Sequence, residues 1–355
     1  MARSLPLALL AFLVIVVQQV TQWTETTYYL TQLTMTAYYS LVIVGLCLLM
    51  GYAGQISLGH AGFFAIGGYL SAMLTTHDLT PHQGLATIKV LDALGLLTTR
   101  QDIFGAAILH FTPWAACITA VLTAALIAFC LGIPVLKLKG HYLAMATLGF
   151  GIIIYRVALA SRLFGEADGI SEVPGFTLLP GLTVSGDFAS RTSNYYIAWA
   201  IVLLAMLLLS NLIHSRIGRA LRAIHGSEEA ARAMGVDTAR CKLQTFVLSA
   251  VLAAVAGVFL THFNGGIGPS EAGIMKSVRY VAIVAIGGMA NLWGALTMGV
   301  VLNFLSLRGF FGTYDDAVFG IILIAIMLFA PHGLLHRGIL RELKTLFRKD
   351  DHGAA

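Results

Sequence analysis

The amino-acid sequence predicts an all-α membrane protein that crosses the bilayer about ten times, within a range of about eight to ten. Hydrophobic residues make up 58% of the 355 positions, and the mean hydropathy is +0.83. Charged residues make up only 11%, whereas a soluble domain carries about 25%. One span needs about 20 residues, so the chain is long enough for ten. The apolar runs are residues 5–20, 28–50, 60–76, 105–135, 141–160, 194–214, 243–263, 278–291, 294–311 and 316–332.

The first apolar run resembles a signal peptide, because Arg3 precedes it. Its end carries bulky or polar residues from Val17 to Val20 in place of a small-residue cleavage site, so we expect a retained first helix. We treat residues 1–355 as a single transmembrane domain. Its parts are residues 1–27, the first helix and an outer turn; residues 28–336, the core; residues 215–242, a loop within the core; and residues 337–355, a basic tail.

The distribution of basic residues predicts the orientation. With the N-terminus inside, fourteen of the 22 Lys and Arg residues fall on the inner side and seven on the outer side, and Arg156 lies within a span. An excess of Lys and Arg in loops marks the cytoplasmic face. The pattern therefore predicts that both termini are cytoplasmic. It also explains the net charge of +5 without a nucleic-acid partner.

The longest polar interruption in the second half, residues 215–242, carries six Lys and Arg residues and falls on the same inner side. A short helix is expected at its centre. Ser227 is a good N-cap, Glu228 and Glu229 place negative charge on the first turn, and Gly235 can end the helix in the left-handed conformation. A short, charged, capped helix on the basic side suggests a docking surface for a soluble partner.

Two glycine-rich regions stand apart, with six glycines in residues 51–68 and four in residues 287–299. One interpretation is close helix packing through small residues. The other is a pair of helix breaks that line a cavity, as in two inverted repeats of about five helices around a central substrate site. On the second interpretation the candidate pathway and hinge residues are Gly51, Gly54, Gln55, Gly59, His60, Gly62, Gly287, Gly288, Asn291 and Gly294.

Catalytic and metal-binding patterns are absent from the sequence. There is no GxxxxGKS/T phosphate loop. The four cysteines are scattered, and the pair His332 and His336 lacks a third ligand, so no metal site is expected. No Asp or Glu lies in the interior of a proposed span, which disfavours proton coupling. We therefore predict a transport role without a cofactor in this chain. Arg156 either snorkels to the interface or lines the pathway.

Two longer segments lie on the predicted outer side. Residues 77–104 are mixed in polarity and are expected to form a small amphipathic cap. Residues 161–193 are rich in Gly, Ser, Thr and Pro and are expected to form an ordered loop with a locally negative face.

Six motifs occur in the order GYAGQISLGHAGFFAIGGYLSAML, GHYLAMATLGFG, EADGISEVPG, SRIGRALRAIHGSEEAARAMGVDTARCKLQTF, AIGGMANLWGALTMG and APHGLL. In this order they resemble permeases of the branched-chain amino acid ABC transporters, of the LivM type, over most of residues 37–336. The resemblance implies a bacterial inner-membrane protein that carries leucine, isoleucine or valine, and a coupling helix that matches the EAA motif of importer permeases. Its coupling residues would be Ser227, Glu228, Glu229, Ala230, Ala231 and Gly235.

The resemblance also implies partners. These are a LivH-like second permease, LivG-like and LivF-like ATPases that bind ATP and Mg²⁺, and a periplasmic or lipid-anchored solute-binding protein. The chain departs from the family pattern at His141-Tyr142, at Ile152 and in the length of residues 77–104. These departures leave urea or short-chain amides open as alternative substrates. A stand-alone secondary carrier or channel is the alternative from another class.

Overall fold

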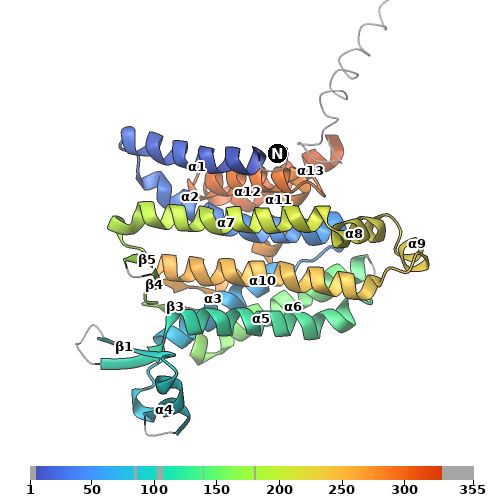
Figure 1. Cartoon of the computed structure of the whole chain (residues 1–355). Helices are drawn as coiled ribbons and strands as arrows, with labels where there is room; N and C mark the ends of the chain where they lie inside the picture. The colour runs from blue at the N-terminus through green and yellow to red at the C-terminus, as the bar shows by residue number, and fades with distance from the viewer. Residues whose placement is uncertain (1–4, 84–85, 102–106, 139, 180, 330–355) are drawn as a thin grey trace, which may run out of the picture.

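A computed structural model describes residues 5–83, 86–101, 107–138, 140–179 and 181–329, and most of these residues are helical. The longer helices lie side by side, and successive ones run in alternate directions (Figure 1). Each of the ten predicted spans overlaps one of them, although residues 330–332 and the tail at 337–355 lie outside the described residues. The helices are α1 (Leu5–Trp23), α2 (Tyr28–Cys47), α3 (His60–Thr76), α5 (Pro113–Val135), α6 (His141–Ala160), α7 (Arg191–His214), α10 (Thr238–Asn264), α11 (Ile274–Gly287), α12 (Leu292–Leu307) and α13 (Asp315–Phe329).

Six helical segments are long and apolar enough to cross a membrane, which agrees with a polytopic membrane protein. A seventh apolar helix, α12, is shorter than a full span. These counts refer to the described part of the chain. The six segments are Leu5–Trp23, Tyr28–Tyr52, Pro113–Val135, His141–Ala160, Phe188–His214 and Thr238–Asn264.

The all-α fold class holds for the bundle, but the described connections also contain three antiparallel two-stranded sheets that were not predicted. They gather at one end of the bundle, which we call the strand end (Figure 1). Polar, glycine-rich connections lack a helix to satisfy their backbone groups, and strand pairing satisfies them instead. The sheets pair β1 (Leu97–Gln101) with β2 (Ala107–Phe111), β3 (Ile170–Ser171) with β6 (Gly266–Ile267), and β4 (Phe176–Leu179) with β5 (Leu182–Val184).

The described parts of the two predicted outer segments lie at the strand end. Residues 77–104 contain a short 3-10 turn, Thr80–His82, the helix α4 (Ala86–Ala93) and β1. This cap has its own small hydrophobic cluster around Ile88, Leu97 and Leu109. The 161–193 loop carries β3, β4 and β5. Other 3-10 turns are Arg162–Phe164, Phe188–Ser190, Pro269–Ala272 and Gly312–Tyr314.

Two short helices, α8 (Arg216–Gly226) and α9 (Glu228–Ala233), lie at the opposite end, which we call the α9 end (Figure 1). The predicted helix of Ser227 to Gly235 is confirmed. The Ser227 hydroxyl accepts a hydrogen bond from the Ala230 amide at 3.3 Å, and Gly235 follows the helix with φ of +82°. Asp237 then caps α10 by accepting from the Arg240 amide at 3.0 Å.

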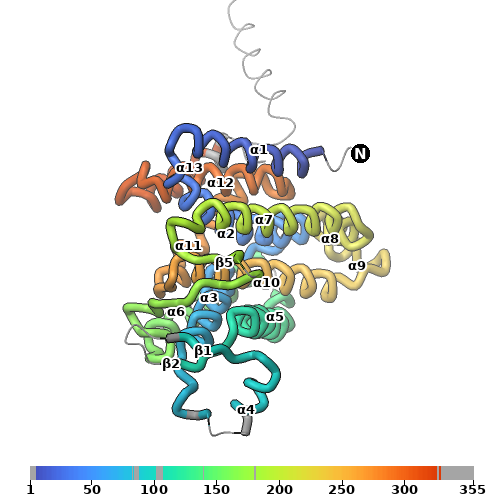
Figure 2. The backbone as a smooth tube through the Cα atoms, turned by 60° about the vertical axis from the view of Figure 1, so that its left-hand side comes forward, coloured from blue at the N-terminus to red at the C-terminus, as the bar shows by residue number. Residues whose placement is uncertain are grey.

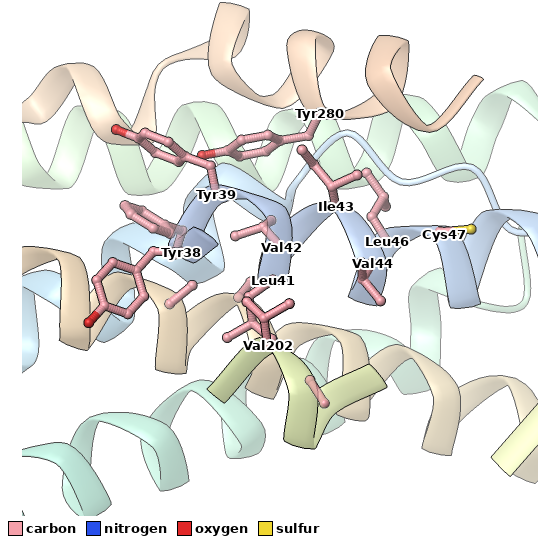
Figure 3. Packing of buried hydrophobic residues seen from close by; sticks show 14 of the residues in the cluster. Tyr38, Tyr39, Leu41, Val42, Ile43, Val44, Leu46, Cys47, Val202 and Tyr280 are labelled. Carbon is pink, nitrogen blue, oxygen red and sulfur yellow. The ribbon is translucent and has the colours of Figure 1, made fainter. Parts of the chain in front are cut away.

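The core forms around α2, in which every residue from Thr36 to Cys47 is buried. A π-helical turn, Leu48–Tyr52, extends α2 toward the α9 end. Figure 3 shows the side chains of Tyr38, Leu41, Val42 and Ile43 packed between the surrounding helices. This placement makes α2 the element on which the other helices are positioned.

The helix contacts follow a paired pattern. α2 packs against α12, and α10 packs against α5. In the same way, α3 packs against α5 and α6, while α11 packs against α12 and α13. The closest association in the bundle is between α3 and α10, which lie together in both views (Figures 1 and 2).

Candidate functional site

The first helix break, residues 53–59, joins the π-helical turn to α3 at the α9 end. Gly54 has φ of +67°, and a β-carbon there would lie 2.9 Å from Nδ1 of His225 in α8. The Leu58 amide donates to the Thr147 hydroxyl of α6 at 3.0 Å. The break is therefore an ordered segment that touches both α6 and α8.

The second helix break, residues 288–291, turns the chain sharply between α11 and α12. Gly288 and Ala290 have φ of +99° and +65°. Asn291 caps α12, because its side-chain oxygen accepts from the Gly294 amide at 3.1 Å. A β-carbon on Gly287 would lie 2.6 Å from the Gly294 carbonyl oxygen, so glycine allows the two helix ends to meet.

The π-helical turn that precedes the first break contacts the second break at the α9 end. A β-carbon at Gly51, in the π-helical turn just before the first break, would overlap the backbone of Ala290 in the second. Only a glycine permits this approach without displacement of one backbone. Residues that are more than 200 positions apart in the sequence therefore form one joined element.

The other candidate glycines of the first region pack α3 against α6. A β-carbon on Gly59 would lie 2.6 Å from the Thr147 carbonyl oxygen, and one on Gly62 would lie 3.2 Å from the Phe150 ring. The structure contains both close packing through glycine and breaks at glycine, and the pathway role of the breaks stays a prediction. Some glycines occupy breaks, and others allow close helix packing.

The remaining candidate on α3, His60, is 1% exposed and hydrogen-bonds to two serines. Its Nδ1 lies 3.1 Å from the Ser57 hydroxyl, and its Nε2 lies 2.6 Å from the Ser249 hydroxyl of α10. A neutral imidazole can satisfy one serine as donor and the other as acceptor. His60 therefore links the end of the first break to α10.

The predicted coupling helix, α9, is attached to α10 through Glu228. This carboxylate pairs with the Lys242 ammonium and with Arg232 at 3.4 Å, and it accepts from the Thr238 hydroxyl at 3.2 Å. Ala231 is also buried, at 4% exposure. Glu228 and Ala231 thus fix α9 in place.

The neighbouring residues of α9 face the opposite way. Glu229 and Ala230 are exposed, and Met234 at the end of the helix is 85% exposed. The adjacent carboxylates differ in burial, because Glu228 is half-buried and Glu229 is exposed. One holds the helix to the protein, and the other lies on the accessible face.

A cavity of about 340 Å³ lies between the first break and residues 215–242, which we call the coupling segment after its predicted role. It connects two sets of residues that the sequence predicted separately, the hinge candidates and the coupling residues. Its lining is Ala53, Gly54, Gln55, Leu138, Gly140, Leu143, Ile224, His225, Ser227, Glu228, Glu229 and Lys242.

A half-buried ionic cluster toward the strand end of α11 was not predicted. The Lys276 ammonium lies 3.0 Å from the Glu271 carboxylate and 3.0 Å from the Tyr39 hydroxyl of α2. The ammonium also lies 4.5 Å from the centroid of the Tyr39 ring. Figure 3 shows the rings of Tyr39 and Tyr280 side by side, with both hydroxyls pointing the same way. A Glu and a Lys five residues apart beside Gly273, between two apolar runs, were the signal available in the sequence.

Other polar candidates have simpler positions. Arg156 is exposed on α6. Among the residues that the structure describes, no group of three or more His, Cys, Asp or Glu side chains could hold a metal ion. His332 and His336 lie outside that part of the chain.

Comparison with known proteins places this geometry in context. Residues 28–328 match the family described as branched-chain amino acid transport system / permease component. The chain is 30% identical over 324 residues to the high-affinity branched-chain amino acid transport system permease protein LivM of Salmonella typhimurium, which covers 85% of this chain and 68% of the relative. It is 28% identical over 312 residues to LivH of the same organism, covering 86% and 93%. It is 27% identical over 313 residues to BraD of Pseudomonas aeruginosa, covering 86% and 94%. No solved structure matches the chain.

Proposed function

This chain belongs to the family of permease components of branched-chain amino acid transport systems, and we propose that it forms part of the translocation pathway of an ATP-driven importer. The relatives named LivM, LivH and BraD are permeases rather than enzymes. Leucine, isoleucine and valine are the proposed substrates. The chain works with a LivH-like second permease, LivG-like and LivF-like ATPases, and a solute-binding protein on the opposite side of the membrane.

The observation that carries this proposal is the connection from α9 to both helix breaks. The ionic contacts of Glu228 fix α9 to α10, and His225 of the adjacent α8 packs against Gly54 in the first break. Gly51 then contacts Ala290 in the second break. A displacement of α9 by an ATPase therefore has a continuous path of close contacts into the membrane region.

The proposed mechanism is alternating access driven from outside the chain. ATP closes the ATPase dimer, α9 moves as a rigid lever, and the breaks at 53–59 and 288–291 act as hinges. The pathway between the two permeases then changes the side to which it is open. The solute-binding protein supplies much of the specificity, so this mechanism requires no deep polar site in this chain.

The paired packing of the helices supports an inverted repeat within a ten-span topology. In this arrangement α1, α2, α3, α5 and α6 correspond to α7, α10, α11, α12 and α13. The equivalent contacts are α2 on α12 with α10 on α5, and α3 on α6 with α11 on α13. Inverted repeats place equivalent segments at opposite ends of the bundle. The counterpart of the first break is then residues 265–273 at the strand end, and not the second break.

The proposed orientation places the α9 end in the cytoplasm of a bacterial cell, with the chain in the inner membrane. The basic residues of the coupling segment favour this side. The helix directions then put the N-terminus on the cytoplasmic side. The ionic cluster of Tyr39, Glu271 and Lys276 falls toward the outer side.

Charge reversal on the accessible face of α9 tests the proposal. Glu229→Lys should retain ATP hydrolysis by the reconstituted four-subunit importer but reduce leucine uptake per ATP, because the docking surface changes while the Glu228 contacts stay. Paired assays of uptake and phosphate release in proteoliposomes measure this ratio. Glu166→Lys is the matched control, since Glu166 is an exposed carboxylate at the strand end.

Backbone geometry provides a second test at the same helix. Gly235→Ala places a β-carbon at φ of +82°, which should shift the end of α9 and lower coupling. The control Gly226→Ala adds a β-carbon where no atom lies within 4 Å and φ is negative. Wild-type uptake in Glu229→Lys and Gly235→Ala would contradict the lever. Gradient-driven flux through this chain alone would favour a secondary carrier.

A further inference from the structure

The cavity between the first break and the coupling segment contains an unsatisfied polar side chain. Gln55 is 3% exposed, and neither its amide nitrogen nor its amide oxygen has a hydrogen-bond partner among the described residues. Burial of a polar group without a partner is unfavourable, and such groups in native proteins require an explanation. Gln55 lines the cavity, but both amide atoms are almost inaccessible, so a ligand supplies the missing acceptor and donor only when the side chain turns toward the cavity.

The rest of the lining combines charge with apolar surface. Glu228 contributes a carboxylate and Lys242 an ammonium whose side chain is 9% exposed. Leu138, Leu143 and Ile224 contribute aliphatic groups. This combination complements a small zwitterion that carries an apolar side chain. Glu228 and Lys242 pair with each other, so the ligand inserts into this ion pair. Its ammonium then contacts the carboxylate, its carboxylate contacts the Lys242 ammonium and the Gln55 amide nitrogen, and its hydrocarbon packs on the aliphatic groups.

The position of the cavity gives such a ligand a mechanical effect. Ala53 and Gly54 belong to the first break, whereas Ile224, Ser227 and Glu228 belong to the coupling segment. A ligand that contacts both elements stabilises the conformation in which they lie at this separation. Since a ligand favours the state that it binds more tightly, it opposes a change in that separation.

We propose that this cavity is a regulatory site on the α9 side that binds a neutral amino acid with an apolar side chain, and that occupation slows the transport cycle. The inference rests on the proposed function, because α9 must move for the ligand to restrain it. The same chemical class is then recognised as cargo on one side of the membrane and as an inhibitor on the other. Accumulated product would limit its own import.

The experiment uses the complete importer in proteoliposomes, with the α9 end facing a lumen that contains ATP. Initial uptake of labelled leucine is measured with and without unlabelled L-leucine preloaded in the lumen. We expect uptake to fall by about fivefold, at the lower end of common allosteric coupling. Lumenal isovalerate lacks the ammonium, isoamylamine lacks the carboxylate and glycine lacks the apolar side chain, so none of the three should inhibit.

A pair of variants locates the effect. Gln55→Leu should lose most of the inhibition, expressed as the ratio of uptake rates without and with lumenal leucine in the same variant. Its melting temperature should not fall, because the substitution removes an unsatisfied buried amide. Gln244→Leu makes the same chemical change at an exposed position of α10 that does not line the cavity, and it should remain fully inhibited.

The outcomes separate this inference from the proposed function. ATP-driven uptake that is insensitive to lumenal leucine would overturn the regulatory site and leave the importer assignment intact. Equal inhibition of Gln55→Leu and the unaltered protein would also overturn it. If the assembly shows no ATP-driven uptake, the proposed function fails.

Binding of labelled leucine to the assembly in nanodiscs, without the binding protein, then decides whether the regulatory site exists. Loss of this binding in Gln55→Leu but not in Gln244→Leu supports the site, and any other result excludes it.

Discussion

The helices α3 and α11 are each adjacent to a helix break, but they are fastened to the bundle in different ways. α3 is held to α10 by contacts along its length. β-carbons at Gly67 of α3 and Gly257 of α10 would overlap the facing backbone, and hydrogen bonds link His60 to Ser249 and Ser71 to His262. These are neutral groups buried between two helices, and they hold α3 and α10 as one unit.

By contrast, α11 carries ion pairs near its start, in addition to its packing against α2 and α12. Lys276 pairs with Glu271, and Arg279 pairs with Asp315 at 3.2 Å and Asp316 at 2.9 Å. Its other end reaches the second break, where Ala290 contacts Gly51. Ion pairs can exchange partners as a pathway opens, whereas interlocked backbones cannot. From this difference we infer that α3 and α10 move together and transmit a displacement. We infer that α11 changes its position relative to them when its ion pairs exchange partners.

We expect the largest effect from a substitution that separates the π-helical turn before the first break from the second break. Gly51→Ala should largely abolish uptake and destabilise the protein by about 3 kcal/mol or more, because the added methyl group overlaps the Ala290 backbone. Uptake in proteoliposomes and thermal melting in detergent measure the two effects. Gly149→Ala is the control, since a β-carbon there meets no atom within 4 Å. A Gly51→Ala protein with normal uptake would show that the contact between Gly51 and Ala290 is not required.

An intermediate effect is expected at the ionic attachment of α11. Glu271→Gln leaves the half-buried Lys276 ammonium without its carboxylate partner, which should cost up to about 3 kcal/mol and reduce uptake several-fold. The double variant Glu271→Gln/Lys276→Met should recover the melting temperature, because no unpaired ammonium remains. It should not recover uptake, because the ion pair that can exchange partners is absent. Full recovery of uptake by the double variant would show that the ion pair only stabilises the fold. The attachment of α11 would then be like that of α3, which depends on packing.

The smallest effect is expected where α3 meets α10. Ser71→Ala removes one interhelical hydrogen bond and leaves His262 bound to the Pro174 carbonyl oxygen at 2.7 Å. The free energy of unfolding should fall by about 0.5–1 kcal/mol. Uptake should be nearly unchanged, because the backbone packing between the two helices remains. Ser193→Ala, at an exposed position of α7, is the matched control. A large loss of uptake in Ser71→Ala would mean that the α3–α10 unit is not held mainly by packing.

Much of the helix layout followed from the sequence, because apolar runs of spanning length have few alternatives. The runs at 60–76 and 141–160 coincide with α3 and α6. The caps of α9 were also predictable, since Ser227 and Gly235 act through local backbone geometry. The strands were not predicted, because a two-residue pair such as β3 with β6 depends on a partner distant in the chain.

Within the candidate site, the sequence determined which residues are chemically unusual: the capped acidic helix, the two glycine-rich regions and Gln55. Only the tertiary structure decided their relations. It joined Gly51 to Ala290, and it turned Glu228 inward to Lys242 while Glu229 stayed exposed. It also enclosed the Gln55 amide and assembled Tyr39, Glu271 and Lys276. Hydrophobicity and caps act over a few residues and can be read in sequence order. Close backbone approach and charge pairing depend on which helices become neighbours, and that is determined when the whole bundle packs.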